Sequence, residues 1–203
     1  MLEAYGKGIG QLKFSRDGHQ LVALYLSWTI RLWDTESAKC KEVIELSESQ
    51  ISDIIDDAGD PISRVSISPC GNLLAISDSP SIRVWDLQEQ KDVMVLKGLD
   101  FAKRCIEWSP CGGWIAVGCH DRTVRLSQTS NRGSVVKKSD MLTVRDISGS
   151  VSCLAWSPTN PLEFATGCRS GSVCVWRIEE FNGKFRVQLV WDSLVGRLTA
   201  SGT

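Results

Sequence analysis

The segment Ile67-Ser68-Pro69-Cys70-Gly71, followed by Ile82-Arg83-Val84-Trp85-Asp86, decides the fold, because both phrases recur along the chain. The first phrase returns as FSRDG at 14–18, WSPCG at 108–112 and, in degenerate form, WSPTN at 156–160. The second returns as IRLWD at 30–34, VRLS at 124–127 and VCVWR at 173–177. The serines of the first phrase are 53, 41 and 48 residues apart, and the tryptophan position of the second follows each serine by 18, 17, 18 and 19 residues. Two phrases at nearly constant spacing indicate four structural repeats.

Each repeat has the pattern of four short strands. Before each serine, apolar residues alternate with other residues, as at Ile106 and Trp108, and a period of two is typical of a β-strand. Proline or aspartate with glycine then favours a turn, since glycine adopts a positive φ at no steric cost. The second strand has an alanine at matching places, the third carries the tryptophan phrase, and a variable fourth follows. The alanines are Ala23, Ala75, Ala116 and Ala165.

These repeats resemble those of the WD40 family, whose period is about 40–45 residues and whose third strand ends on Trp-Asp. The resemblance covers residues 10 to 192 and implies an all-β fold, a β-propeller of WD40 type with four blades of four antiparallel strands. It predicts one domain over 1–203, with repeats at about 10–47, 62–98, 102–140 and 150–192. More narrowly, residues 153–177 resemble the carboxyl-terminal WD40 array of fungal NACHT/NTPase–WD40 (heterokaryon-incompatibility-like) proteins, which implies a sensing part of a larger signalling protein.

The resemblance gives structural roles to the serines of the first phrase, the tryptophans of the second and one turn aspartate. These residues are Ser15, Ser68, Ser109, Ser157, Trp33, Trp85, Trp176 and Asp121. The tryptophans are expected to be buried, together with Phe14, Ile67, Trp108 and Trp156. Gly98-Leu99 stands where the family often has Gly-His, and repeat three has Ser127 where the other repeats have the tryptophan. No repeat therefore has the complete polar network of the family, and we expect lower stability than in consensus repeats.

The number of repeats predicts an open or partial propeller. Propellers close with about four to eight blades, and the family mostly closes with more than four. A blade buries its faces only against neighbours, so an open array exposes apolar surface at both ends. We expect further propeller blades or a second copy to cover these faces.

Composition and charge narrow the choice of partners. Hydrophobic residues make up 42% and charged residues 23% of the chain, as in a globular protein. The formal net charge of −1 disfavours nucleic acid, although an insert at 131–145 is basic and reads either as a solvated loop or as a binding element. No apolar run reaches the roughly 18 residues of a membrane helix, and residues 1–10 lack a signal peptide's apolar stretch. We expect no membrane partner and a place in the cytoplasm or the nucleus.

Catalytic and metal-binding patterns are lacking in the sequence. There is no nucleophile elbow or Gly-rich phosphate loop, and the family uses the turn at His120-Asp121 structurally. The eight cysteines form no C-x-x-C pair and there are two histidines, so a zinc site is disfavoured. We predict no cofactor and no enzyme activity. Most cysteines occupy repeat-equivalent positions, so Cys119 and Cys168 should be buried, whereas Cys111 lies in a turn and should be exposed.

These features predict a non-catalytic protein–protein interaction scaffold; the alternative is a nucleic-acid-associated WD40 protein that binds through its basic insert. Because the chain reverses with each strand, the turns between strands two and three lie at the same end as the connections between repeats. WD40-like proteins commonly bind peptides or partner domains on such a surface. The predicted partner-binding residues there are Trp28, Lys103, Arg104, His120, Arg122 and Arg169, with Asp56 and Asp57 of an acidic insert. Trp28 is either a binding anchor or a cover for a neighbouring blade.

Overall fold

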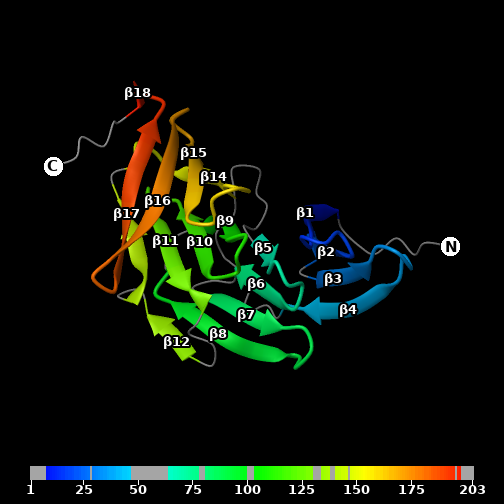
Figure 1. The fold of residues 1–203 in the computed structure, drawn as a ribbon. Coiled ribbons are helices and arrows are strands. Elements are labelled where there is room, and N and C mark those ends of the chain that lie inside the picture. Colours follow the sequence, from blue (N-terminus) through cyan, green and yellow to red (C-terminus); the bar gives the residue numbers. More distant parts are fainter. Residues whose placement is uncertain are drawn as a thin grey trace.

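A computed structural model describes residues 8–27, 29–46, 64–77, 81–99, 103–129, 134–137, 140–145, 147–194 and 196–197. Over these ranges the chain folds into strands and turns, grouped in four sheets. The sheets follow one another along an arc that does not close into a ring (Figure 1). They are the four predicted blades, and the prediction of an all-β, open propeller is confirmed. The described residues include no helix long and apolar enough to cross a membrane.

Each blade is an antiparallel sheet whose strands follow the order of the sequence. Blade 1 contains β1 (Ile9–Phe14), β2 (Gln20–Tyr25), β3 (Thr29–Asp34) and β4 (Cys40–Glu45); blade 2 contains β5 (Arg64–Ile67), β6 (Leu73–Ser77), β7 (Ile82–Asp86) and β8 (Lys91–Lys97). Blade 3 contains β9 (Lys103–Trp108), β10 (Trp114–Cys119), β11 (Val124–Gln128) and β13 (Leu142–Val144). Blade 4 contains β14 (Val151–Trp156), β15 (Glu163–Cys168), β16 (Val173–Phe181) and β17 (Lys184–Asp192), with the short β18 (Gly196–Arg197) beyond. The first strands of consecutive blades contact one another, so β1, β5, β9 and β14 form the inner edge of the arc.

The basic insert at 131–145 is not a loop along its described length. Its strand β12 (Ser134–Lys137) pairs in parallel with β8 and adds a fifth strand to blade 2. The chain then returns to blade 3, where β13 pairs with β11 as the outermost strand. The loop interpretation is therefore wrong for these two segments. The outer edge of β8 offers unpaired N–H and C=O groups, and β12 satisfies them.

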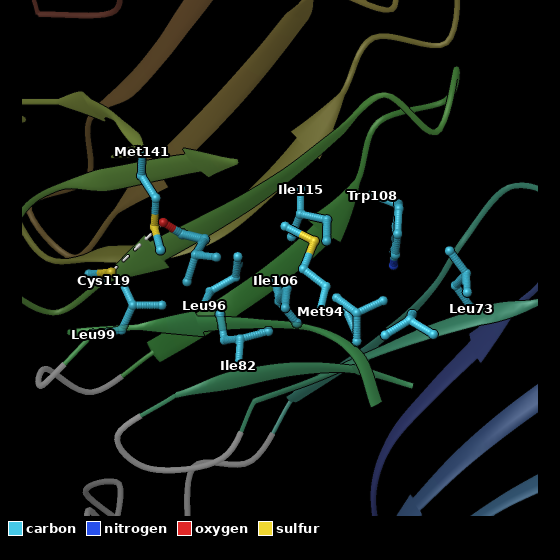
Figure 2. Packing of buried hydrophobic residues seen from close by; sticks show 14 residues of the cluster. Leu73, Ile82, Met94, Leu96, Leu99, Ile106, Trp108, Ile115, Cys119 and Met141 are labelled. Atoms are coloured by element: carbon cyan, nitrogen blue, oxygen red, sulfur yellow. Dashed lines mark hydrogen bonds between the residues drawn. The ribbon is translucent and has the colours of Figure 1, made fainter. Parts of the chain in front are cut away.

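Every blade has two unlike faces. Its preceding face packs on the blade before it in the sequence and its following face packs on the blade after it. Figure 2 shows this packing between blades 2 and 3, where Met94 of blade 2 lies near Ile106 and Ile115 of blade 3. The alternation of side chains along each strand assigns successive residues to opposite faces.

The strand register corrects one equivalence. Phe14 pairs with Leu21 in blade 1, as Ile67 pairs with Leu74 in blade 2. The blade 1 counterpart of Ala75, Ala116 and Ala165 is therefore Val22, one residue before Ala23.

Burial separates the predicted core residues into two groups. Ile67, Trp108 and Trp176 are buried, whereas Trp33, Trp85 and Trp156 are half-buried. Phe14 is 64% exposed, so the prediction that it is buried is wrong. Its ring lies on the preceding face of blade 1, against which the described chain packs no blade.

The predicted serines close the turn between the first two strands of each blade. The hydroxyl of Ser68 accepts a hydrogen bond from the backbone N–H of Leu73 at 3.0 Å, and Ser109 does the same for Trp114 at 2.9 Å. In blade 1, Ser15 accepts from the N–H of Gln20 at 2.9 Å. The degenerate repeat differs, since Ser157 accepts from Asn160 three residues on, at 3.1 Å. Each bond satisfies a backbone donor that the turn would otherwise leave unpaired.

Candidate functional site

One end of the array gathers the turns between second and third strands and the segments that enter the first strands; we call it the connection end. Lys103, at the start of β9, pairs with Cys119, at the end of β10. Val151 and Cys168 are paired in the same way in blade 4. These registers bring Arg104, His120, Arg122 and Arg169 to the connection end. Trp28, Asp56 and Asp57 lie outside the described residues, as does the side chain of Lys103.

The turn between β10 and β11 is held together by Asp121. Its carboxylate accepts a hydrogen bond from the Thr123 hydroxyl at 2.5 Å and lies 3.5 Å from the Arg125 guanidinium. Arg125 is buried and also donates to the Thr143 hydroxyl at 2.5 Å, so one polar cluster joins the turn to β11 and β13. The carboxylate is engaged below the surface while His120 is exposed. Asp121 therefore orders the turn.

The corresponding turn of blade 4 uses hydroxyl groups. Ser148, Ser170 and Ser172 contact one another, with oxygen–oxygen distances of 3.1 Å from Ser148 to Ser170 and 3.0 Å from Ser170 to Ser172. The N–H of Arg169 donates to the Ser150 carbonyl at 2.9 Å, which fixes the turn against the start of β14. The motif residues of the family do not predict this cluster, because they place an aspartate and a histidine where this chain has serines. A Ser-x-Ser turn paired with an upstream serine would have been the signal.

Four basic side chains reach solvent at the connection end of blades 3 and 4. His120, Arg122 and Arg169 stand in the two turns, and Arg145 directly follows β13, whose Val144 pairs with Val124. Arg122 has a φ of 60° where the matching Gly171 has a φ of 86°, so the tight turn is the same in both blades. We call His120, Arg122, Arg145 and Arg169 the basic rim. Arg104 is half-buried beside it, and its carbonyl accepts a hydrogen bond from Arg64 at 2.9 Å.

A pocket that sequence reasoning did not find lies at the opposite end, on the inner edge of the arc. It has a volume of about 290 Å³ and takes residues from all four first strands and the turns after them. Phe14, Ile67, Trp108 and Trp156 line its apolar side, and the Ser-Pro turns supply three prolines. Because the serine phrase ends each first strand, its recurrence was the available signal for a shared pocket.

The pocket is tied together by polar contacts between blades. Glu107 of blade 3 forms an ion pair with Lys13 of blade 1, and its carboxylate lies 3.4 Å from the Ser66 hydroxyl of blade 2. Trp108 donates through Nε1 to the Ser66 carbonyl at 3.1 Å, and Trp156 donates to the Glu107 carbonyl at 3.3 Å. Each indole thus binds the blade before it at the same position. These contacts hold the blades together around the pocket, which is also a concave surface.

The thiols follow the predicted division. Cys119 and Cys168 are buried, and Cys111 is exposed, as predicted. Burial raises the pKa of the Cys105 thiol to about 12 and that of Cys174 to about 11, so neither is a nucleophile near neutral pH. Within the described ranges no three His, Cys, Asp or Glu side chains lie close enough together to hold a metal ion.

Comparison with curated proteins finds WD-repeat relatives. A WD repeat-containing protein of Dictyostelium discoideum is 27% identical over 163 residues, which is 78% of this chain and 25% of that protein. The target of rapamycin complex subunit wat1 of Schizosaccharomyces pombe is 28% identical over 108 residues, or 52% of this chain and 31% of that protein. The chain thus spans about a quarter to a third of the length of these relatives.

Solved structures match the fold more completely. A chain of the mitotic checkpoint complex superposes with a TM-score of 0.65 at 17% identity, over 91% of this chain and 50% of that one. The structure of U3-55K gives a TM-score of 0.67 at 20% identity, over 92% and 53%. The family model "WD domain, G-beta repeat" matches residues 51–86, 91–126 and 141–177, which together exceed half of the chain. Blade 1 lies outside these ranges but forms the same four-stranded sheet, and the chain belongs to the WD40 family of β-propeller proteins.

Proposed function

We propose that this chain is a non-catalytic protein-interaction scaffold and that its basic rim binds an acidic segment of a partner protein. WD40 propellers are generally scaffolds that bind other proteins. The S. pombe relative is named as a complex subunit, and one structural neighbour is part of the mitotic checkpoint complex. Both support a role in assembly.

The observation that carries the proposal is the arrangement of Arg122, Arg145 and Arg169. All three are exposed at one end of adjacent blades, and the turns that carry Arg122 and Arg169 are fixed from beneath by Asp121 and by the serine cluster. Binding residues on rigidly held turns lose little conformational freedom on association. Arginines pair with carboxylates bidentately, so an acidic peptide fits this surface.

Two further hypotheses accompany this proposal, one about a sensing role and one about nucleic acid as the ligand. The resemblance of residues 153–177 to fungal NACHT/NTPase–WD40 arrays supports a sensing role in a larger signalling protein, placed in the cytoplasm or the nucleus. Nucleic acid is the competing ligand for a basic surface, and Arg145 belongs both to the rim and to the basic insert. A steep loss of binding as the salt concentration rises would favour nucleic acid as the ligand.

The test is a pull-down that compares two charge-reversal variants. Arg122→Glu with Arg169→Glu alters the rim; Lys39→Glu with Lys184→Glu makes the same charge change at exposed positions of the opposite end. Exposed charges contribute little stability, so both variants should unfold at nearly the wild-type temperature. The proposal expects that partners recovered with the wild-type chain are lost from the first variant and kept by the second.

Equal recovery with both variants would move the binding site away from the rim. A labelled single-stranded oligonucleotide serves as the second probe. If it binds the wild-type chain more tightly than a glutamate-rich peptide does, and the rim variant abolishes that binding, the ligand is nucleic acid and the protein-scaffold proposal fails.

A further inference from the structure

Two blade faces have no blade against them in the described chain, and the first is the preceding face of blade 1. It displays Leu12, 52% exposed, and Phe14, 64% exposed, beside Ile9 and Val43, which are also exposed. The counterparts of Leu12 in the other blades are Val65, Ile106 and Leu154, and all three are buried. Large apolar side chains at these positions fill a space on the preceding blade, so the blade 1 face is built for such a space.

The second uncovered face is the following face of blade 4, and small residues line its inner part, whereas the ion pair of Glu163 and Arg177 and the side chains of Val173 and Val175 lie farther out on it. The small residues are Cys153, Ala155, Ala165 and Gly167, which alternate across β14 and β15. The matching positions of blade 3 are Cys105, Glu107, Ala116 and Gly118, and they receive blade 4. A Cβ at Gly118 would come within 2.6 Å of Val151 Cγ1 in blade 4, whereas a Cβ at Gly167 would meet only Cys153. Blade 4 thus repeats the receiving surface of blade 3 and leaves it open.

Two inter-blade hydrogen bonds mark the same position in the interfaces between blades 2 and 3 and between blades 3 and 4. Trp108 binds the carbonyl of Ser66 and Trp156 binds that of Glu107, and the next carbonyl in this series belongs to Ala155. The residue that would cover it is the counterpart of Trp156 in a following blade. Among the described residues, the counterpart without a preceding blade is Phe14 of β1, at the other end of the arc (Figure 1). Its ring has no N–H, so it would cover this carbonyl by packing and not by a hydrogen bond.

We propose that a second copy of this chain completes the propeller: Leu12 and Phe14 of one copy pack on Ala155, Ala165 and Gly167 of the other, and the reciprocal contact closes a ring of two copies. The two surfaces are complementary in size and continue the packing already seen between blades 3 and 4. Unlike faces that meet head to tail either close into a ring or propagate as a filament. The chain spans 50% and 53% of the two solved chains that it matches, so two copies have about the length of one such chain.

The test is the mass of the 203-residue chain in solution, by sedimentation velocity. The wild type should sediment at twice its 22.4 kDa. Leu12→Glu with Phe14→Glu should be monomeric, and so should Ala165→Glu, because the counterpart of Ala165 in the closed blade 3 interface is the fully buried Ala116. Leu194→Glu is the matched control, since Leu194 is 66% exposed in the turn after β17, and it should dimerise like the wild type.

Mixing the two defective variants gives the decisive readout. Each has one intact face, and together they hold one complete interface, so head-to-tail contact predicts a heterodimer from two monomeric proteins. A milder change, Phe14→Ala, should weaken dimerisation by about 10- to 100-fold for each interface, the usual effect of exposing one buried aromatic side chain. This variant removes apolar surface that is exposed in the single chain, so folding should be unaffected and circular dichroism checks it.

Three results would overturn the proposal. A monomeric wild type at concentrations up to 100 times those of the pull-down, roughly the range that separates strong from weak association, means that other blades or no partner cover the faces. Dimers of Ala165→Glu mean that blade 1 faces meet each other. Species larger than a dimer that grow with concentration mean that the contact propagates and does not close.

Discussion

Gly118 and Gly167 occupy the same position in blades 3 and 4, and their replacement by alanine tests how the blades pack. A Cβ at Gly118 would collide with Cys105 Sγ of its own blade and would lie 2.6 Å from Val151 Cγ1 and 3.2 Å from Val151 Cβ. Val151 is fully buried and cannot rotate away. A Cβ at Gly167 would meet Cys153 Sγ at 2.6 Å, but Cys153 is exposed and its side chain has open space to turn into.

The expected change in the free energy of unfolding is the sum of two opposing contributions. One extra carbon in a well-packed interface costs about 1–3 kcal/mol, and loss of glycine's freedom in the unfolded chain returns about 0.4–1 kcal/mol. Gly118→Ala should therefore destabilise the chain by about 1–2 kcal/mol net. Gly167→Ala should be neutral or stabilising by up to about 1 kcal/mol, because only the second term applies.

The assay is urea unfolding followed by tryptophan fluorescence, at a protein concentration where the chain is monomeric. The midpoint should fall for Gly118→Ala at an unchanged slope, and its melting temperature should fall by about 2–8 °C for a chain of this size. In a Val151→Ala background the cost of Gly118→Ala should shrink, because the clashing Cγ1 is gone. Equal stability of the two glycine variants would refute the assignment of Gly118 to a closed blade interface.

Three further outcomes follow from the structure. Trp176→Ala should lower the free energy of unfolding by about 3–5 kcal/mol, since the ring is buried and its Nε1 donates to the Thr166 hydroxyl at 3.0 Å. The Trp33 side chain is half-buried, so Trp33→Ala should lower the free energy of unfolding clearly less in the same urea titration. The reverse order would contradict the burial pattern. Iodoacetamide at pH 8 should modify the exposed Cys111 and Cys153 much faster than the buried Cys119 and Cys168. Burial raises the pKa of the Cys105 thiol to about 12, so this thiol should react measurably only in more alkaline solution. Uniform labelling of all cysteines, measured by mass spectrometry, would show that the blades are not packed. Hydrogen bonds from Lys41 and Ser37 hold the pKa of Asp34 below its ordinary value. The Asp34 carboxylate therefore stabilises the fold above about pH 4, and this effect is lost as the pH falls further. Between pH 5 and pH 3, roughly the window of carboxylate titration, the Asp34→Asn variant should lose less stability than the wild type.

The repeat phrases were sufficient to predict four blades and the strands within them, because period-two burial and turn chemistry are local properties of the sequence. They failed where burial depends on a neighbour. Phe14 has the same local pattern as Trp108, yet it is exposed because the described chain packs nothing against its face. The same reason explains why β12 was missed, since its pairing partner β8 lies about 40 residues earlier in the chain.

The candidate sites show the same division. Strand parity alone placed Arg104, His120, Arg122 and Arg169 at one end, because each strand reverses the chain whatever its side chains are. The pocket around Glu107 could not be predicted in this way. It depends on the curvature of the arc, which brings Lys13 of blade 1 to Glu107 of blade 3 across blade 2, and curvature is a property of side-chain volumes summed over three interfaces.

The turns of the basic rim explain why binding and folding can be tested separately. Blade 3 holds its turn with a carboxylate, a hydroxyl and the buried Arg125, whereas blade 4 holds the equivalent turn with three serine hydroxyls. Two unrelated polar clusters thus support one backbone shape, with a positive φ at Arg122 in one blade and at Gly171 in the other. Since the shape depends on the groups beneath the turn, the outward side chain of Arg122 contributes charge and not architecture. Reversing that charge therefore probes recognition, whereas Asp121→Ala would leave the buried Arg125 without its carboxylate, a loss that costs about 3–5 kcal/mol for a buried pair, and would probe the fold.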